Sequence, residues 1–233
     1  MAKALIIGAG GLGVPAALAA ARINCAQLTI IDPDQVQLSN LARQVIYQAA
    51  DLGEAKAEVC AAELRRRYMG VEVHGYPIAF DESNGAELIR AHDFTIDATD
   101  DPIVKFLIND LSLKVGRPFS YGGVLGMRGQ TMTFRPGHGG ACLRCLFEEP
   151  PLEHEVASCR DAGIIGPVAA LIGEIQAAEA ARCLRGQSPQ LTSCMLTYDA
   201  RDLRMRTIEV KPRMDCLCAQ YGRAQTVARA LAG

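Results

Sequence analysis

Polar and charged side chains gather in one short stretch of this sequence, Asp32–Gln44. The stretch contains two acids, an asparagine and an arginine, and it directly follows the apolar run Leu28–Ile31, so Asp32 ends a predicted buried strand. The glycine-rich segment Gly8–Gly13 precedes it, and Lys56 follows it. Together these residues predict a nucleotide site, with a glycine turn under the phosphates, an acid for the ribose and cations for the phosphoryl oxygens.

The glycines form the pattern G-x-G-x-x-G between a predicted strand, Ala4–Ile7, and a predicted helix, Leu12–Arg22. Such a turn lets backbone N–H groups at the start of a helix face an anion. Taken alone, the pattern would also fit NAD, with Asp32 as the ribose-binding acid. The cations Arg43 and Lys56 suit the charge of a triphosphate better, although each could instead be a solvated surface cation.

A second group of acids follows the next predicted buried strand, Phe94–Ile96, in the run Asp97–Asp101. The carboxyl end of a strand lies on the ligand edge of an open α/β sheet, so Asp100 is a candidate to hold Mg²⁺ between phosphates. The alternative is that Asp100 caps the predicted helix Ile103–Val115.

Nine cysteines are many for this length. Four of them form two close pairs, Cys142 with Cys145 and Cys216 with Cys218. Two close pairs favour a structural Zn²⁺ site, because zinc in such sites is bound by four ligands in a tetrahedron. Only one residue separates the second pair, so buried reduced thiols are the alternative.

The elements that must position these side chains can be predicted from apolar periodicity. After Lys56 the pattern predicts a helix over Lys56–Tyr68, then a strand, a short helix and the strand Phe94–Ile96. Further on it predicts a strand, an antiparallel extension, a crossover loop, a long Ala-rich helix and two closing strands. The corresponding segments are Val71–Tyr76, Ala86–Ala91, Pro118–Tyr121, Gly129–Arg135, Glu148–Ala162, Ile164–Leu184, Leu196–Tyr198 and Met205–Val210. This order predicts an α/β fold with a Rossmann-like, mainly parallel sheet and an antiparallel extension.

Composition argues against two classes of partner, nucleic acids and membranes. The chain has 233 residues and a net charge of −2, without a basic run, which argues against nucleic acid as a partner. The uncharged run Ala4–Ala21 could suggest a signal peptide or a membrane span. It divides instead into a strand, an ordered glycine motif and a helix, and no other segment is long enough to span, so we expect no membrane association.

Several motifs in the same order resemble the E1-like ThiF/MoeB/HesA adenylyltransferases. They are G-x-G-G-L-G, then D-P-D-x-V-x-x-S-N-L-x-R-Q, G-x-x-K at Gly53–Lys56, D-A-T-D, C-x-x-C, and S-C-x-x-A-G-x-x-G-P at Ser158–Pro167. The resemblance runs from Ala4 to Cys218. It implies the extended sheet of ubiquitin-activating enzymes, with residues 1–218 as the adenylation domain and residues 219–233 as a C-terminal tail.

The resemblance also implies the chemistry and the partners. Such proteins use Mg·ATP to adenylate the C-terminal glycine of a ubiquitin-like sulfur-carrier protein ending in Gly-Gly, for thiamine, molybdopterin or related cofactor synthesis. They are cytoplasmic, usually homodimers, and often hold a four-cysteine zinc. The nucleotide-binding residues it implies here are Gly11, Asp32, Ser39, Asn40, Leu41, Arg43, Lys56, Asp100 and Asp101. Of these, Arg43, Lys56 and Asp100 would act in catalysis, and Cys159 matches a cysteine that links covalently to the carrier in some members.

Three departures from the family pattern affect these expectations. The chain starts at its first strand, without the N-terminal segment whose arginine reaches the partner subunit's ATP, so we expect a reduced rate or an arginine from another protein. Lys105 stands where the family usually has an arginine, and Asp101 stands where it has an asparagine. The second cysteine pair is one residue short. No rhodanese-like extension follows, so we expect a separate sulfur donor.

Other functions stay open at this point. An NAD-dependent dehydrogenase would need a hydride-site His or Tyr at a strand end, and none of the four histidines is so placed. A non-catalytic scaffold could keep the carrier-binding surface without turnover. Within the enzyme class, a peptide or a modified tRNA base could be the group that is adenylated.

Overall fold

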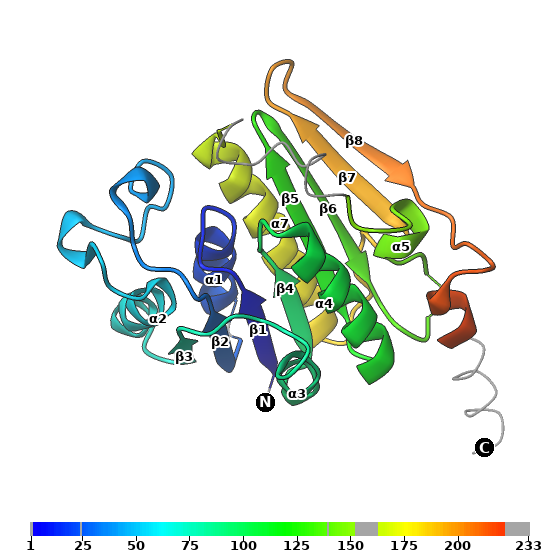
Figure 1. The fold of residues 1–233 in the computed structure, drawn as a ribbon, viewed down its shortest axis with the longest axis horizontal. Coiled ribbons are helices and arrows are strands. Elements are labelled where there is room, and N and C mark those ends of the chain that lie inside the picture. Colours follow the sequence, from blue (N-terminus) through cyan, green and yellow to red (C-terminus); the bar gives the residue numbers. More distant parts are fainter. Residues whose placement is uncertain (1, 24, 139, 152–162, 222–233) are drawn as a thin grey trace.

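The computed structural model describes residues 2–23, 25–138, 140–151 and 163–221. Its strands form one eight-stranded sheet in the order β3-β2-β1-β4-β5-β6-β7-β8. The first five strands in that order run parallel, and β6, β7 and β8 continue the sheet antiparallel (Figure 1). The predicted α/β fold with an antiparallel extension is thus confirmed.

The elements alternate between strand and helix as far as β5. The strands are β1 (Lys3–Ile7), β2 (Gln27–Ile31), β3 (Glu72–Tyr76), β4 (Phe94–Asp97), β5 (Phe119–Leu125), β6 (Arg128–Phe134), β7 (Cys194–Asp199) and β8 (Arg204–Glu209). The helices are α1 (Gly13–Arg22), α2 (Lys56–Arg67), α3 (Gly85–Ala91), α4 (Pro102–Val115), α5 (Leu143–Leu146) and α7 (Gly166–Leu184), with 3₁₀ helices η1 (Leu38–Asn40) and η2 (Ala49–Asp51). The crossover segment 152–162 lies outside the described residues.

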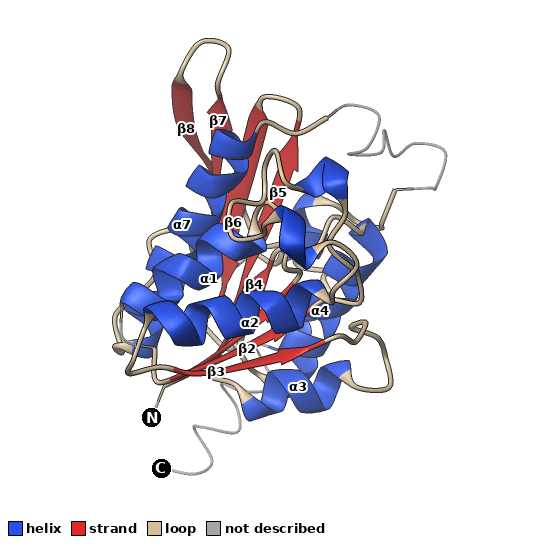
Figure 2. Cartoon of the chain, turned by 90° about the vertical axis from the view of Figure 1, so that its left-hand side faces the viewer, coloured by secondary structure: helices blue, strands red, loops and turns tan. Residues whose placement is uncertain are grey.

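Helices cover both faces of the sheet (Figure 2). Side chains of α1, α2 and α7 pack with Ala4 and Ile6 of β1 on one face, and those of α3 and α4 pack with Leu5 and Ile7 on the other. The last four residues of β1 are buried, as expected of a central parallel strand whose faces are both covered. This two-sided burial explains why the strand reads as an unbroken apolar run.

Register brings three loops to one edge of the sheet. Ile7 at the end of β1 pairs with Ile31 of β2 on one side and with Asp97 of β4 on the other. The glycine loop, the Asp32 segment and the acidic run after β4 therefore leave the sheet side by side. The strand order reverses between β1 and β4, which is where open α/β sheets bind ligands.

The boundaries of α4 correct one prediction. The side chain of Asp101, not Asp100, caps this helix, accepting hydrogen bonds from the backbone N–H groups of Ile103 (2.7 Å) and Val104 (3.4 Å). Pro102 can occupy the first turn because it has no N–H to satisfy there. Asp100 is one residue too far from the helix to act as its cap, so its carboxylate is left at the ligand edge.

The run Ala4–Ala21 divides as predicted into β1, the glycine loop and most of α1. Among the described residues, no helix combines the length and the apolar character needed to cross a bilayer.

Candidate functional site

The glycine loop is held tightly to the sheet at its two ends. Gly8 has φ +100°, and a Cβ there would lie 2.7 Å from the carbonyl oxygen of Ala98. A Cβ at Gly13 would lie 1.8 Å from the carbonyl oxygen of Gly8. No side chain fits at either position, and the same contacts join the loop to the segment after β4.

The two glycines in the middle of the loop have more space around them than Gly8 and Gly13. A Cβ at Gly10 would be 3.7 Å from the amide nitrogen of Gln44, and one at Gly11 would be 3.7 Å from the carbonyl oxygen of Arg43, both ordinary contacts. The protein's own packing therefore does not demand glycine at these two positions. A ligand that approaches the backbone closely would demand it.

Asp32 joins the glycine loop to the segment after β2. The residue is 6% exposed, and its carboxylate accepts hydrogen bonds from the N–H groups of Ala9 (2.6 Å) and Asp34 (2.8 Å). Burial raises the pKa of Asp32, and the two N–H donors and Lys56 oppose that shift. The carboxylate lies next to the loop, where the sequence predicted the ribose-binding acid.

Lys56 begins α2 and is buried, with 6% of its surface exposed. Its Nζ lies 2.7 Å from Oδ2 of Asp34, whose side chain is mostly exposed. The alternative interpretation of Lys56 as a solvated surface cation was therefore wrong. Because the side chain extends from the helix start back to the segment after β2, its charge lies near the carboxylate of Asp32.

The stretch after Asp32 is built from turns rather than from the start of a regular helix. Asn40 ends η1, and its Oδ1 accepts from the N–H of Gln37 at 3.2 Å. The guanidinium of Arg43 donates to the carbonyl oxygen of Ser39 at 2.8 Å. The main chain of Arg43 lies between the glycine loop and the start of α7, because a Cβ on Gly166 would be 3.5 Å from its Cα. Ser39 is exposed, Leu41 is half-buried, and Asn40 is buried.

Two residues near the glycine loop had no role in the sequence analysis. The hydroxyl of Tyr47 donates to the carbonyl oxygen of Ala9 at 2.7 Å, which ties the loop to the segment before α2. Gln44 is 3% exposed, and its Oε1 has no hydrogen-bond partner among the residues that the structure describes. Nothing in the local sequence pattern distinguishes Tyr47, since its contact is with a residue 38 positions away.

Within the acidic run after β4, the residues have different surroundings. Asp97 is fully buried, and Nζ of Lys105 lies 3.1 Å from both of its oxygens and 2.5 Å from the carbonyl oxygen of Gly122. Burial raises the pKa of Asp97 to about 6, with Lys105 opposing the shift. Asp101 caps α4, and Asp100 is exposed beside them. The run thus supplies a buried ion pair, a helix cap and one carboxylate facing outward.

A cavity of about 920 Å³ begins at Asp100 and extends over the antiparallel strands. Its lining includes Lys105 and Tyr121 on the inner side, Gln130 of β6, and Arg206 of β8. The hydroxyl of Tyr121 accepts from Nε2 of Gln130 at 2.6 Å, and Nζ of Lys105 lies 5.0 Å from the Tyr121 ring. No other residue of the predicted nucleotide set lines this cavity. Asp100 is therefore the point where the predicted nucleotide-binding residues meet the cavity over the antiparallel strands.

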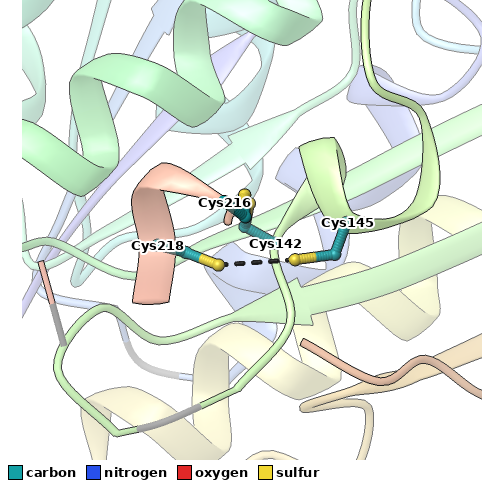
Figure 3. Close-up of side chains that lie close together, drawn as sticks. All are labelled: Cys142, Cys145, Cys216 and Cys218. Carbon is teal, nitrogen blue, oxygen red and sulfur yellow. Dashed lines mark hydrogen bonds between the residues drawn. The ribbon is translucent and has the colours of Figure 1, made fainter. Parts of the chain in front are cut away.

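The two cysteine pairs converge as predicted (Figure 3). The four sulfur atoms lie within 4.8 Å of one another, with Cys142 Sγ 3.5 Å from Cys216 Sγ and Cys145 Sγ 3.4 Å from Cys218 Sγ. A tetrahedral Zn²⁺ with Zn–S bonds of ~2.3 Å would hold its sulfurs about 3.8 Å apart. The donor set and its spacing fit that ion, and one residue between Cys216 and Cys218 is enough.

The first cysteine pair is positioned by α4. The buried Asn109 accepts from the N–H of Leu143 at 3.0 Å, and Asp110 makes two hydrogen bonds with Arg144, at 2.8 and 2.7 Å. The N–H of Arg213 donates to Sγ of Cys145 at 3.4 Å. Cys159, the predicted covalent residue, lies outside the described residues.

Comparison with known proteins agrees with this architecture. Residues 1–219 match the ThiF family. The chain is 35% identical over 219 residues to a sulfur carrier protein adenylyltransferase of Thermus thermophilus, covering 92% of this chain and 81% of that protein. It is 39% identical to the adenylyltransferase and sulfurtransferase MOCS3 of Arabidopsis thaliana over 90% of this chain, but it spans only 45% of that relative's length.

Among solved structures, MccB of E. coli has a TM-score of 0.81 to this chain at 19% identity, covering 93% of this chain and 64% of MccB. This similarity concerns the fold alone. The sequence match, together with the glycine loop, the Asp32 segment and the converging cysteines, assigns the family: the chain belongs to the ThiF family.

Proposed function

We propose that this protein transfers the adenylyl group of ATP to the C-terminal glycine of a ubiquitin-like sulfur-carrier protein. The Thermus thermophilus relative, of which this chain covers 81%, is named a sulfur carrier protein adenylyltransferase. The proposal needs two binding regions that meet at one point, one for Mg·ATP and one for an extended peptide tail.

The glycine loop and its neighbours would hold ATP. Gly10 and Gly11 leave the backbone open to close approach, and Asp32 lies where a ribose hydroxyl would bind. Arg43 and Lys56 would hold phosphate oxygens, with Ser39, Asn40 and Leu41 forming the turn around them and Asp101 supporting the loop before α4. Asp34, which pairs with Lys56, would keep that ammonium oriented until phosphate replaces it.

The observation that carries the proposal is the position of Asp100. It follows the strand next to the glycine loop, and it also lines the large cavity. Adenylation requires the α-phosphorus and a carboxylate from a second molecule to meet, so the junction between the two regions is where the reaction would occur. Mg²⁺ held by Asp100 would neutralise charge on the phosphates.

The reaction needs little from the protein beyond position and charge. A carboxylate oxygen of the carrier's terminal glycine would attack the α-phosphorus, forming the P–O bond of an acyl-adenylate while the bond to pyrophosphate breaks. The nucleophile is already ionised, so no general base is required. The cations Arg43 and Lys56 would stabilise the negative charge that develops on the leaving pyrophosphate.

The four-cysteine cluster would hold a structural Zn²⁺. Its ligands would be Cys142 and Cys145, which cap and belong to α5, and Cys216 and Cys218 near the described C-terminal end. Four thiolates leave no open position for substrate. Zinc would therefore tie the two segments together rather than take part in the reaction.

The remaining partners stay predictions. The family pattern favours a homodimer and a cytoplasmic location, and the lack of a disulfide among the described cysteines suits a reducing compartment. Cys159 would form a covalent link to the carrier after adenylation. A serine at that position would then leave adenylation intact and slow sulfur transfer.

Carrier-dependent exchange of labelled pyrophosphate into ATP tests the proposal. The substrate is a recombinant ubiquitin-fold carrier ending in Gly-Gly, and the matched control is the same carrier without its last glycine. We expect exchange with the intact carrier and none with the shortened one. Exchange that ignores the carrier, or tight NAD binding without ATP binding in a calorimetric titration, would overturn the proposal.

A further inference from the structure

Two turns lie side by side at the outer end of the antiparallel extension (Figure 1). One joins β5 to β6 and the other joins β7 to β8. Arg128 pairs with Asp199 across the two hairpins, and the N–H of Ala200 donates to the carbonyl oxygen of Met127 at 2.9 Å. The turns therefore form one continuous surface beside the large cavity.

Arginine and apolar side chains make up this surface. We call it the hairpin patch and define it as Leu125, Arg128, Arg201, Leu203, Arg204 and Arg206. Leu203 is 77% exposed and Leu125 is 48% exposed, and all four arginines also line the cavity. Exposed apolar side chains mixed with arginine are typical of protein-binding surfaces.

The hairpin patch carries an excess of positive charge. Asp199 is shared by Arg128 at 3.0 Å and Arg201 at 2.9 Å, and Asp202 pairs with Arg204 at 3.2 Å. The guanidinium of Arg206 makes no ion pair with any described residue. Four arginines against two aspartates leave the sheet side of the cavity cationic.

The acids that line the cavity elsewhere do not cancel this charge locally. Asp100 precedes α4 and Glu149 follows α5, so both belong to the opposite wall. The cavity thus has a polarity, with carboxylates toward the helices and guanidinium groups toward β8. A partner whose tail enters the cavity would meet the arginines with its folded body.

We propose that the hairpin patch binds an acidic face of the carrier, so that the enzyme recognises the carrier's body separately from its Gly-Gly tail. This inference rests on the proposed function, since it takes the carrier as the occupant. Beyond that function, it states the chemistry of the carrier surface that the enzyme recognises: carboxylates around a small apolar centre. Charged groups at the rim of an interface govern encounter and salt dependence more than the chemical step.

Arg206→Glu is the main test variant, because Arg206 lies on the outermost strand, away from the glycine loop, and its removal leaves no described acid unpaired. We expect the KM for the carrier in pyrophosphate exchange to rise about tenfold, with the KM for ATP and kcat unchanged. Arg206→Lys, which keeps the charge, should stay within about twofold of the wild type. Arg90→Glu, on the exposed side of α3, is the matched control for net charge.

A second experiment varies the carrier. It compares the native recombinant carrier with a neutralised form, in which surface Asp and Glu residues away from the tail are changed to Asn and Gln. Neutralisation should raise the KM with the wild-type enzyme and have little further effect with Arg206→Glu. Raising NaCl from about 50 to about 300 mM should weaken binding of the native carrier to the wild type more than to the variant.

Fluorescence anisotropy of the labelled carrier without ATP separates the two proposals. Carrier binding that weakens in Arg206→Glu, in an enzyme that shows no exchange, would keep the docking surface and reject the adenylation. Normal exchange with the same carrier KM in wild type, Arg206→Glu and the neutralised carrier would reject the docking surface alone. Tighter binding of an RNA oligonucleotide than of the carrier would also overturn it.

Discussion

Glycines of the loop after β1 are required for two different reasons. Gly8 and Gly13 are required by the protein, because a Cβ would collide with the main chain of Ala98 or of Gly8. At Gly11, ordinary packing would admit a methyl group. Under the proposed function, a bound nucleotide is the reason for a glycine at that position, and substitution can separate folding from binding.

Gly11→Ala should leave the midpoint of thermal unfolding nearly unchanged and weaken ATP binding about tenfold or more, because the methyl group would stand between the backbone and the phosphates. Gly13→Ala is the contrasting variant and should destabilise the fold by several kcal/mol, since its Cβ would lie 1.8 Å from a carbonyl oxygen. Scanning calorimetry and isothermal titration measure the two effects. Unaltered ATP affinity in Gly11→Ala would contradict the assignment of the loop.

Arg43 should matter for turnover more than for binding. Its guanidinium donates to the carbonyl oxygen of Ser39, and its backbone lies beside Gly11 and Gly166, so it is held beside the glycine loop, where the proposed function puts the phosphates. We expect Arg43→Ala to lower the rate of pyrophosphate exchange roughly 100-fold, with a smaller change in the Kd of ATP. Arg90→Ala is the control. Equal losses in rate and affinity would mean that Arg43 binds the ground state and transition state alike.

At the scale of elements, the Asp97–Lys105 pair connects β4, α4 and β5. Lys105 lies on α4, Asp97 ends β4, and the carbonyl oxygen of Gly122 in β5 accepts from the same ammonium. The pair lies beneath the cavity and next to the segment that carries Asp100. Because the pair is buried, water does not compete for its hydrogen bonds, but burial also disfavours the ionised form of Asp97.

The pKa of Asp97, raised by burial to about 6 from an ordinary 3.8, gives a pH dependence with a defined sign. Below pH ~4 both the folded and unfolded states bind this proton, and between pH ~4 and ~6 the folded state binds it more. The contribution of Asp97 to stability is therefore full below pH ~4 and is lost as the pH rises through ~6. The slope cannot exceed one proton, about 1.4 kcal/mol per pH unit.

Urea unfolding of the wild type and Asp97→Asn over this range measures the effect. The difference in unfolding free energy, wild type minus variant, should fall between pH ~4 and ~6 and be level above that. Asp81→Asn gives the opposite sign, because hydrogen bonds from Ser83 lower the pKa of Asp81, so its contribution is lost as the pH falls. A level difference for Asp97→Asn throughout would mean that the carboxylate stays ionised in the folded protein.

At the scale of the whole molecule, the four cysteines join segments that are far apart in the chain. Cys142 and Cys216 are separated by 74 residues, yet their sulfur atoms are 3.5 Å apart. One pair is held on α4 through Asn109, and the other lies near the described C-terminal end. A metal ion there would close a loop that includes β7, β8 and the part of the hairpin patch from Arg201 to Arg206, and so would stabilise the antiparallel part of the sheet.

We expect about one Zn²⁺ per chain in protein purified without added metal. Cys142→Ser should lower the unfolding midpoint by about 5 °C or more, because it removes a ligand from a closed site and zinc binding is coupled to folding. Cys194→Ser, a cysteine outside the cluster, should leave it unchanged. Elemental analysis and thermal scans check both. Wild-type protein that holds no metal as purified, and whose unfolding midpoint Cys142→Ser does not lower, would contradict the zinc site.

Local patterns in the sequence were enough to predict the strands and the long helices, and to propose a nucleotide site. Apolar periodicity predicts β1 and α1 from Ala4–Ala21 without a membrane span, and the glycine pattern with Asp32 predicts a nucleotide site. The alternation in Gly129–Arg135 predicts the antiparallel extension. These inferences depend only on neighbours within one strand or a few helical turns, and such interactions are encoded in adjacent residues.

Contacts between distant segments could be decided only by the tertiary structure. Whether Lys56 is solvated or buried depends on where α2 begins relative to Asp34, and whether Asp100 or Asp101 caps α4 depends on the turn after β4. The cavity combines the segment after β4 with β8, and the order of the sheet places β4 and β8 on opposite sides of β5, β6 and β7. The sequence alone shows which chemical groups are available. Strand register and helix packing, which pair residues irrespective of their separation along the chain, decide which of those groups meet.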